Sequence, residues 1–294
     1  MIIRCLFCLA FLFSVQALAA PPIWETDFGS ELTDLTGDDD EETSVTLSFP
    51  FPFEGTNYTT IFVGTNGGLQ LGDLGDDSNI DYDHSEYMEE FISDLAPSIA
   101  VLNTDIDLTT TGTIHFNDFG GRAVFTWNEV GTHQNEMALS SFQIQLEPSG
   151  RIVFGYDGIL DDPSEDLITD LDEGIVVGIT DGSWPNDGTE PGPTDLSGSF
   201  SSASPHVYDR WCNDVANSCG FGGDDDGLPG PVNTAFDLDQ RNVVFVPNAG
   251  GGFTVNGVES DLEFRSVPTM TSISLFLMAL ILAGLAVVQI SRRF

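Results

Sequence analysis

Short runs of alternating apolar and polar residues fill the middle of the chain. In residues 141–147, with the sequence SFQIQLE, phenylalanine, isoleucine and leucine alternate with glutamine and glutamate. Successive side chains of a strand point to opposite faces, so this pattern predicts a half-buried antiparallel strand. The same reasoning predicts strands at 44–49, 59–63, 68–72, 98–102, 113–116, 122–127, 141–147, 151–156, 175–180 and 242–247.

The turns between these runs indicate the fold class. Asn66-Gly67 and the tripeptide 148–150 (Pro-Ser-Gly) supply the backbone conformations that tight connections need. Many short strands at close spacing predict an all-β fold, an antiparallel β-sandwich over residues 44–183. Residues 85–95 are the best candidate for a short helical segment.

The N-terminus has the layout of an export signal. Arg4 precedes an uncharged apolar run that closes on Ala17, Leu18 and Ala19. Charge, apolar core and a small-residue site in this order predict a secretory signal peptide over residues 1–19, cut before Ala20. A permanent N-terminal anchor is the alternative.

The C-terminus carries a second apolar stretch, residues 273–290. As a helix these residues would span about 27 Å, close to the hydrocarbon thickness of a bilayer. Arg292 and Arg293 follow it within the basic end 291–294, which favours a cytoplasmic C-terminus. We therefore predict one C-terminal transmembrane helix, with a buried core helix as the alternative.

Composition changes along the rest of the chain. Residues 20–43 are acidic and are expected to be a solvated lead-in, residues 184–247 form a loop-rich region with a final strand, and 248–272 are expected to be a spacer. After signal removal the remaining cysteines are Cys212 and Cys219. In an exported chain two nearby cysteines predict one disulfide, because no histidine pair is near to complete a zinc site.

The charge is strongly one-sided. The chain has 47 acidic residues, eight arginines and no lysine, for a formal net charge of −39. Such a field repels nucleic acid and anionic lipid and attracts cations. A lysine-free chain also lacks the amine that a P-loop or a pyridoxal enzyme requires. A hydrophobic content of 41% nevertheless predicts a packed core rather than an acidic disordered chain.

No catalytic constellation is recognisable in the sequence. The four histidines lie outside any zinc-protease spacing, and no nucleophile elbow occurs. We therefore predict a protein that is not an enzyme. A secreted hydrolase with an unrecognised carboxylate site is the alternative.

Calcium is the cofactor that the acidic loops would suit, because Ca²⁺ takes carboxylate and backbone oxygens. A further Asp-rich loop spans 73–83, and no segment completes an EF-hand. Solvated surface acids are the alternative. The principal candidate ligands are Asp105, Asp107, Asp224, Asp225 and Asp226.

Several segments, in order, resemble nidogen-like domains. They include the alternating Phe-Pro start and the Thr-Asn-Gly of 49–72, and the Ala-Pro-x-Ile-Ala step of 96–108. The chain departs from the family at 101–104, where an aromatic-acidic step is usual. The resemblance implies an extracellular β-rich module of adhesion and matrix proteins, without catalytic activity. The segments that carry it are 49–72, 96–108, 122–130, 142–156 and 173–182.

The C-terminal tail resembles the IPTL-CTERM class of sorting signals, which are relatives of PEP-CTERM tails. The match consists of Val267, Pro268, Thr269 and Met270 before the apolar run and the two terminal arginines. This resemblance implies an exosortase-type processing enzyme in a Gram-negative bacterium. The protein would be anchored in the inner membrane and then reach the cell surface or matrix, where a glycan, matrix or surface partner is expected.

Overall fold

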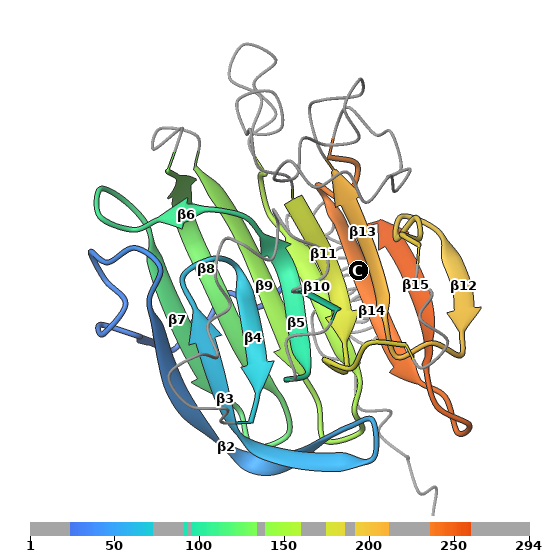
Figure 1. The fold of residues 1–294 in the computed structure, drawn as a ribbon. Coiled ribbons are helices and arrows are strands. Elements are labelled where there is room, and N and C mark those ends of the chain that lie inside the picture. Colours follow the sequence, from blue (N-terminus) through green and yellow to red (C-terminus); the bar gives the residue numbers. More distant parts are fainter. Residues whose placement is uncertain are drawn as a thin grey trace, which may run out of the picture.

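A computed structural model of the chain describes residues 24–72, 91–92, 96–133, 139–159, 175–185, 192–211 and 236–259. These residues contain fifteen strands, which form two sheets in which the neighbouring strands pair antiparallel. The two sheets lie face to face as two layers (Figure 1). The predicted all-β class is thereby confirmed, as two antiparallel sheets.

The larger sheet has nine strands in the order β1-β7-β8-β9-β10-β14-β15-β12, with β6 paired to β8. Its long central strands are joined by short hairpins, so neighbours in the sequence are mostly neighbours in space. Its strands are β1 (Ser30–Glu31), β6 (Ile106–Asp107), β7 (Thr113–Asp118), β8 (Ala123–Thr132), β9 (Ser140–Leu146), β10 (Ile152–Tyr156), β12 (Ser199–Ser202), β14 (Arg241–Pro247) and β15 (Phe253–Glu259).

The smaller sheet has six strands in the order β13-β11-β5-β4-β3-β2. It covers one face of the larger sheet, as the view in Figure 1 shows. Its strands are β2 (Glu42–Phe53), β3 (Thr56–Gly64), β4 (Gly68–Leu71), β5 (Ser98–Asn103), β11 (Ile175–Thr180) and β13 (Val207–Trp211).

One apolar core lies between the sheets and takes residues from both. The alternating Phe-Pro run of β2 shows how the pattern creates it: Phe49, Phe51 and Phe53 are buried, while the prolines between them are more exposed. Proline is tolerated there because β2 is an edge strand. Phe53 contacts Phe253 of the opposite sheet, with ring centroids 5.7 Å apart.

All ten predicted strands are present. Five strands were not predicted, and three of them lie where loops or a spacer were expected: β12 and β13 within 184–247, and β15 within 248–272. β12 has the sequence SFSS and too few apolar residues to signal a strand. It is held by pairing with β15, whose Phe253 and Val255 are buried in the core.

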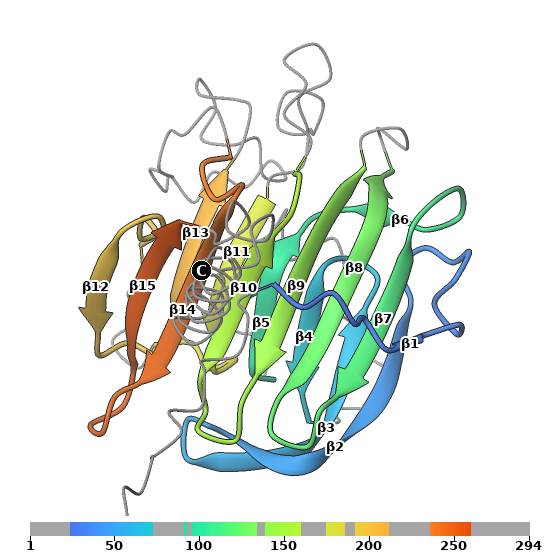
Figure 2. The same ribbon diagram turned by 180° about the vertical axis from the view of Figure 1, so that it is seen from behind.

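An N-terminal strap, residues 24–29, crosses the outer face of the larger sheet (Figure 2). Trp24 is buried, and the backbone N–H and C=O of Glu25 bond to Gln143 at 3.0 and 2.7 Å. The polar face of β9, which was expected to be open to solvent, is therefore covered, and Gln143 and Gln145 are buried. In the described part of the lead-in 20–43, Trp24 and Leu35 are buried, whereas most of the other residues are exposed.

Some predicted features lie outside the described residues. These are the signal peptide, the C-terminal apolar stretch 273–290 and, apart from Phe91 and Ile92, the helical segment 85–95. Within the part of the chain that the structure describes, no helix has the length and apolarity needed to cross a membrane.

Candidate functional site

Four segments that are far apart in the sequence meet at the end of the sandwich where β8 ends. They are 38–41 before β2, the β3–β4 turn 64–67, the segment 103–108 after β5, and 131–133. Backbone contacts tie them together: Asp39 forms a bridge with Asp107, Thr65 N–H donates to Glu41 C=O, and His133 N–H donates to Asp105 C=O. The convergence places several acidic side chains in one place.

Asn66 is the centre of this arrangement and is fully buried. Its side-chain Nδ2 donates to Asp40 Oδ1, and its Oδ1 accepts from Ile106 N–H, each at 2.8 Å. Its backbone carbonyl accepts from Asn103 Nδ2 at 2.8 Å. Because a buried amide is costly unless its hydrogen bonds are formed, Asn66 fixes the relative position of the acidic segments.

Gly67 lets the chain pass closely under the segment after β5. Its φ is +79°, and a Cβ atom built on it would lie 2.0 Å from the carbonyl oxygen of Leu102. Only glycine fits this position without moving backbone. The Thr-Asn-Gly sequence is therefore explained by the packing of two backbone segments.

The apolar core supports the same turn from below. The indole Nε1 of Trp127 on β8 donates to the carbonyls of Gly64 and Thr65, at 3.2 and 3.1 Å. Its ring stacks on Phe142, with centroids 5.4 Å apart and planes 19° apart. Trp127 thus links the core between the sheets to the turn that carries Asn66.

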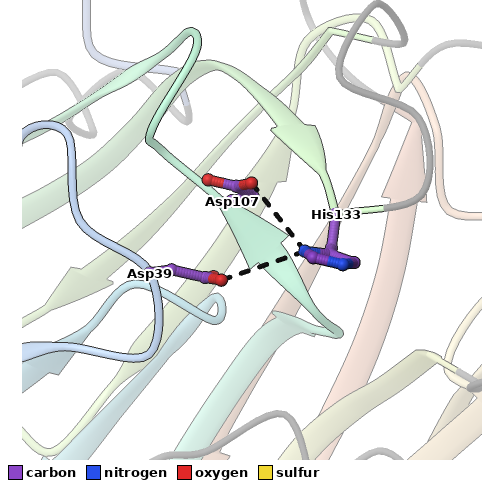
Figure 3. A group of neighbouring side chains, drawn as sticks. All are labelled: Asp39, Asp107 and His133. Carbon is purple, nitrogen blue, oxygen red and sulfur yellow. Dashed lines mark ion pairs between the residues drawn. The ribbon is translucent and has the colours of Figure 1, made fainter.

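Asp39, Asp107 and His133 form a group of potential metal ligands of mixed type among the described residues (Figure 3). His133 Nδ1 lies 3.9 Å from Asp39 Oδ2 and 3.8 Å from Asp107 Oδ2, and one donor atom from each residue lies within 4.8 Å of the others. The Asp107 side chain is 9% exposed and that of His133 is 59% exposed. The group therefore runs from the interior to the surface.

A second group, entirely of carboxylates, shares Asp39 and adds Asp40 and Asp105. Burial raises the pKa of Asp39 above its ordinary value, and the charges of Asp40 and Asp107 raise it further. Asp40 has a φ of +53°, in the left-handed region. Negative charge is thus concentrated at this end of the sandwich.

Two of the predicted calcium ligands, Asp105 and Asp107, lie at this end of the sandwich, each in a different group that shares Asp39, and calcium binding itself stays a prediction. The sequence analysis missed Asp39, Asp40 and His133, because nothing in their spacing connects them. The remaining predicted site residues lie outside the described part of the chain: Ala17, Ala19, Ala20, the loop 73–83, Cys212, Cys219, Asp224, Asp225, Asp226, Val267, Pro268, Thr269, Met270, Arg292 and Arg293.

One further arrangement has residue types found in hydrolases. Thr180 Oγ1 lies 3.0 Å from His206 Nδ1, and His206 Nε2 lies 3.6 Å from Asp181 Oδ1. The Thr180 hydroxyl is fully buried, accepts from Gly182 N–H at 3.0 Å and lies 3.3 Å from the carbonyl of Ile92. The Thr180 hydroxyl is therefore explained by a structural role, because its hydrogen bonds join neighbouring segments of the fold.

Residues 21–209 of the sequence match the family described as NIDO related. The chain belongs to the NIDO-related family. No solved structure gives a significant match. The matched range includes the strap, both groups of ligands and the Thr-Asn-Gly turn, and it extends beyond the 44–183 of the predicted nidogen-like sandwich at both ends. The nidogen-like resemblance is thus confirmed, whereas the sorting tail lies outside the matched residues.

Proposed function

We propose that this chain is an exported protein whose NIDO-related domain acts as a binding or structural module at the cell surface or in the extracellular matrix. The observation that carries this proposal is the family match over residues 21–209. The structure around the Thr-Asn-Gly turn, which is one of the segments that resemble nidogen-like domains, supports it. Hydrogen bonds between the Thr-Asn-Gly turn and the segment 96–108 hold together the acidic end of the sandwich.

The proposal includes the route of export. The signal peptide 1–19 would direct secretion, and the apolar tail 273–290 would hold the protein in the inner membrane until an exosortase-type enzyme acts near Val267–Met270. Removal of both terminal segments leaves five arginines against 47 acidic residues. This charge disfavours nucleic acid as a partner and favours cations or neutral glycans.

The location can be tested in the native host with the full chain. We expect the wild-type protein to be digested by a protease added to intact cells and to end near Val267 by C-terminal mass spectrometry. Pro268→Ala should accumulate uncut in the inner membrane, because Pro268 biases the preceding residue toward the extended form that proteases accept. Pro247→Ala, in strand β14, is the matched control and should be processed normally.

The binding role needs a separate measurement. Deletion of the gene should reduce attachment or matrix retention, and the wild-type gene should restore it. A version with a blocked signal site, Ala17→Leu with Ala19→Leu, should not restore it, because the protein would not be released. Intracellular protein, or unchanged attachment together with turnover of a polymer substrate by the purified chain, would contradict the proposal and favour the hydrolase alternative.

A further inference from the structure

We propose that Asp39, Asp107 and His133 bind one divalent transition-metal ion, of which Zn²⁺ is the simplest case. This site goes beyond the proposed function and does not depend on it. The three residues come from the lead-in, from β6 and from the position directly after β8, and their donor atoms point toward one another in Figure 3.

The spacing of the donor atoms suits an ion better than direct hydrogen bonds. The distances of 3.8 and 3.9 Å from His133 Nδ1 to the two carboxylate oxygens are too long for hydrogen bonds. Ligand atoms that are each about 2.1 Å from a zinc ion lie roughly 3.4 Å apart at the tetrahedral angle. The two distances to His133 Nδ1 would therefore shorten by a few tenths of an ångström, and the two carboxylates, within 4.8 Å of each other, would also move together on binding.

The two carboxylates have no arginine partner, and they differ in burial: the Asp107 side chain is 9% exposed and that of Asp39 is 33% exposed. Asp107 Oδ1 accepts from Thr109 N–H at 2.6 Å, which leaves Oδ2 facing the imidazole. Asp39 Oδ1 is a buried oxygen with no hydrogen-bond partner. No arginine among the described residues forms an ion pair with Asp39 or Asp107. Burying the Asp107 carboxylate without a neighbouring cation is costly, and a bound dication would supply the compensating charge.

The donor types select the class of ion. Calcium and magnesium take oxygen ligands, whereas one imidazole nitrogen with two carboxylates suits zinc and related transition metals. His133 lies at the surface, so the remaining coordination position would face solvent and hold water. The neighbouring all-oxygen group of Asp39, Asp40 and Asp105 is the calcium-type competitor, and it differs from the proposed site in having no need of His133.

The test uses the exported chain, freed of metal with a chelator and shown to be folded by circular dichroism. Isothermal titration with ZnCl₂ should give one tight site. His133→Ala and Asp107→Asn should each weaken it by roughly 10-fold or more, since each loses a ligand. Asp38→Asn is the matched control, because it removes one charge from the same segment without removing a ligand, and it should bind zinc as the wild type does.

Cobalt gives an independent readout, because Co²⁺ in a site of low coordination number absorbs visible light. The wild type should show this absorption, and His133→Ala should lose it while keeping its metal-free melting temperature. Three results would overturn the proposal: folded wild type that binds no zinc, zinc binding unchanged in His133→Ala, or calcium that displaces zinc at a site abolished by Asp40→Asn.

Discussion

The core around Trp127 and the acidic end around Asn66 lie next to each other but are held together by different forces. Between the sheets, Trp127 stacks on Phe142 within a continuous apolar cluster. Above it, Asn66 is as fully buried, yet it contacts its neighbours through hydrogen bonds to Asp40, Ile106 and Asn103. The first region excludes water, whereas the second organises charged groups that reach the surface.

This difference determines what each region tolerates. An apolar core accepts many side chains of similar volume, because dispersion and the hydrophobic effect are not directional. A hydrogen-bonded region such as the acidic end around Asn66, called the junction below, accepts few substitutions, because each lost partner leaves a buried polar group unsatisfied. We therefore expect small substitutions to be more damaging at the junction than in the core, and the following predictions test that expectation in order of decreasing effect.

Gly67→Ala should be the most damaging. Its Cβ would lie 2.0 Å from the Leu102 carbonyl, and the left-handed φ would add strain. We expect a loss of more than about 4 kcal/mol in the free energy of unfolding, or no folded protein, measured by urea denaturation. Gly37→Ala is the matched control, because its φ is +83° with nothing within 4 Å of the added Cβ. It should cost only about 1 kcal/mol, and equal losses in the two variants would show that strain alone matters.

Asp209→Asn tests a polar group placed on the core side of β13. Asp209 is fully buried, and burial raises its pKa to about 7, with the charges of Asp237 and Asp195 acting in the same direction. Between about pH 4 and 7 the folded state holds a proton that the unfolded state has released, so this group's contribution to stability falls as the pH rises. Well above pH 7 Asp209 is ionised in both the folded and the unfolded state, so its contribution to stability no longer changes with pH.

The variant should therefore gain stability relative to the wild type between pH 4.5 and 7.5, by roughly 3 kcal/mol. Urea unfolding of both proteins at several pH values measures this difference, and comparison of the two removes the contribution of the other carboxylates. A constant difference across this range would mean that Asp209 titrates normally in the folded protein. The loss of one backbone hydrogen bond, from Leu196 or Arg210, would lower the variant's stability equally at every pH.

Trp127→Phe separates the two regions at their point of contact. Phenylalanine keeps an aromatic ring against Phe142 but removes the donor to Gly64 and Thr65. We expect a loss of about 2 kcal/mol, together with weaker zinc binding at the proposed site, because the turn that carries Asn66 would loosen. Phe142→Leu changes the core alone and should cost about as much without changing zinc affinity. Weaker zinc binding in both variants would mean that the regions are not separable.

Much of the core could be predicted from the sequence, because a period of two is a local property. Phe142, Ile144 and Leu146 face the core as the alternation of 141–147 indicates. The covering of the opposite face could not be predicted, because the strap that buries Gln143 is 118 residues away in the sequence. β12 was missed for a related reason, since it is held by its partner strand rather than by its own apolar residues.

The acidic end was only partly predictable. Asp105 and Asp107 stood out as a closely spaced pair, but Asp39 was one of a run of acids expected to be solvated. His133 had no neighbour in the sequence to suggest a ligand. What joins them is the antiparallel register of β6 with β8, which pairs Ile106 with Thr132 and so places His133 beside the acidic segment. No local pattern encodes that pairing.

Glu25→Gln tests whether charge adds stability where the strap crosses the sheet, and it is the smallest effect we predict. Glu25 pairs with Arg122 at 2.5 Å, and their side chains are 12% and 10% exposed. Glutamine keeps the shape of glutamate and can still accept a hydrogen bond, but Arg122 would lose the negative charge beside it. The cation–π contact of Arg122 with Phe119, 4.9 Å from the ring centroid, would remain. We expect a loss of about 1 to 2 kcal/mol, because the largely buried Arg122 would exchange a charge-assisted hydrogen bond for a weaker neutral one.

Glu147→Gln is the matched control, since Glu147 pairs with Arg151 four residues along the chain, at a more exposed position. It should cost less than about 0.5 kcal/mol, as surface pairs do. Urea denaturation at low and high salt measures both, and equal losses in the two variants would show that the strap is held by Trp24 and the backbone bonds to Gln143 rather than by its charge.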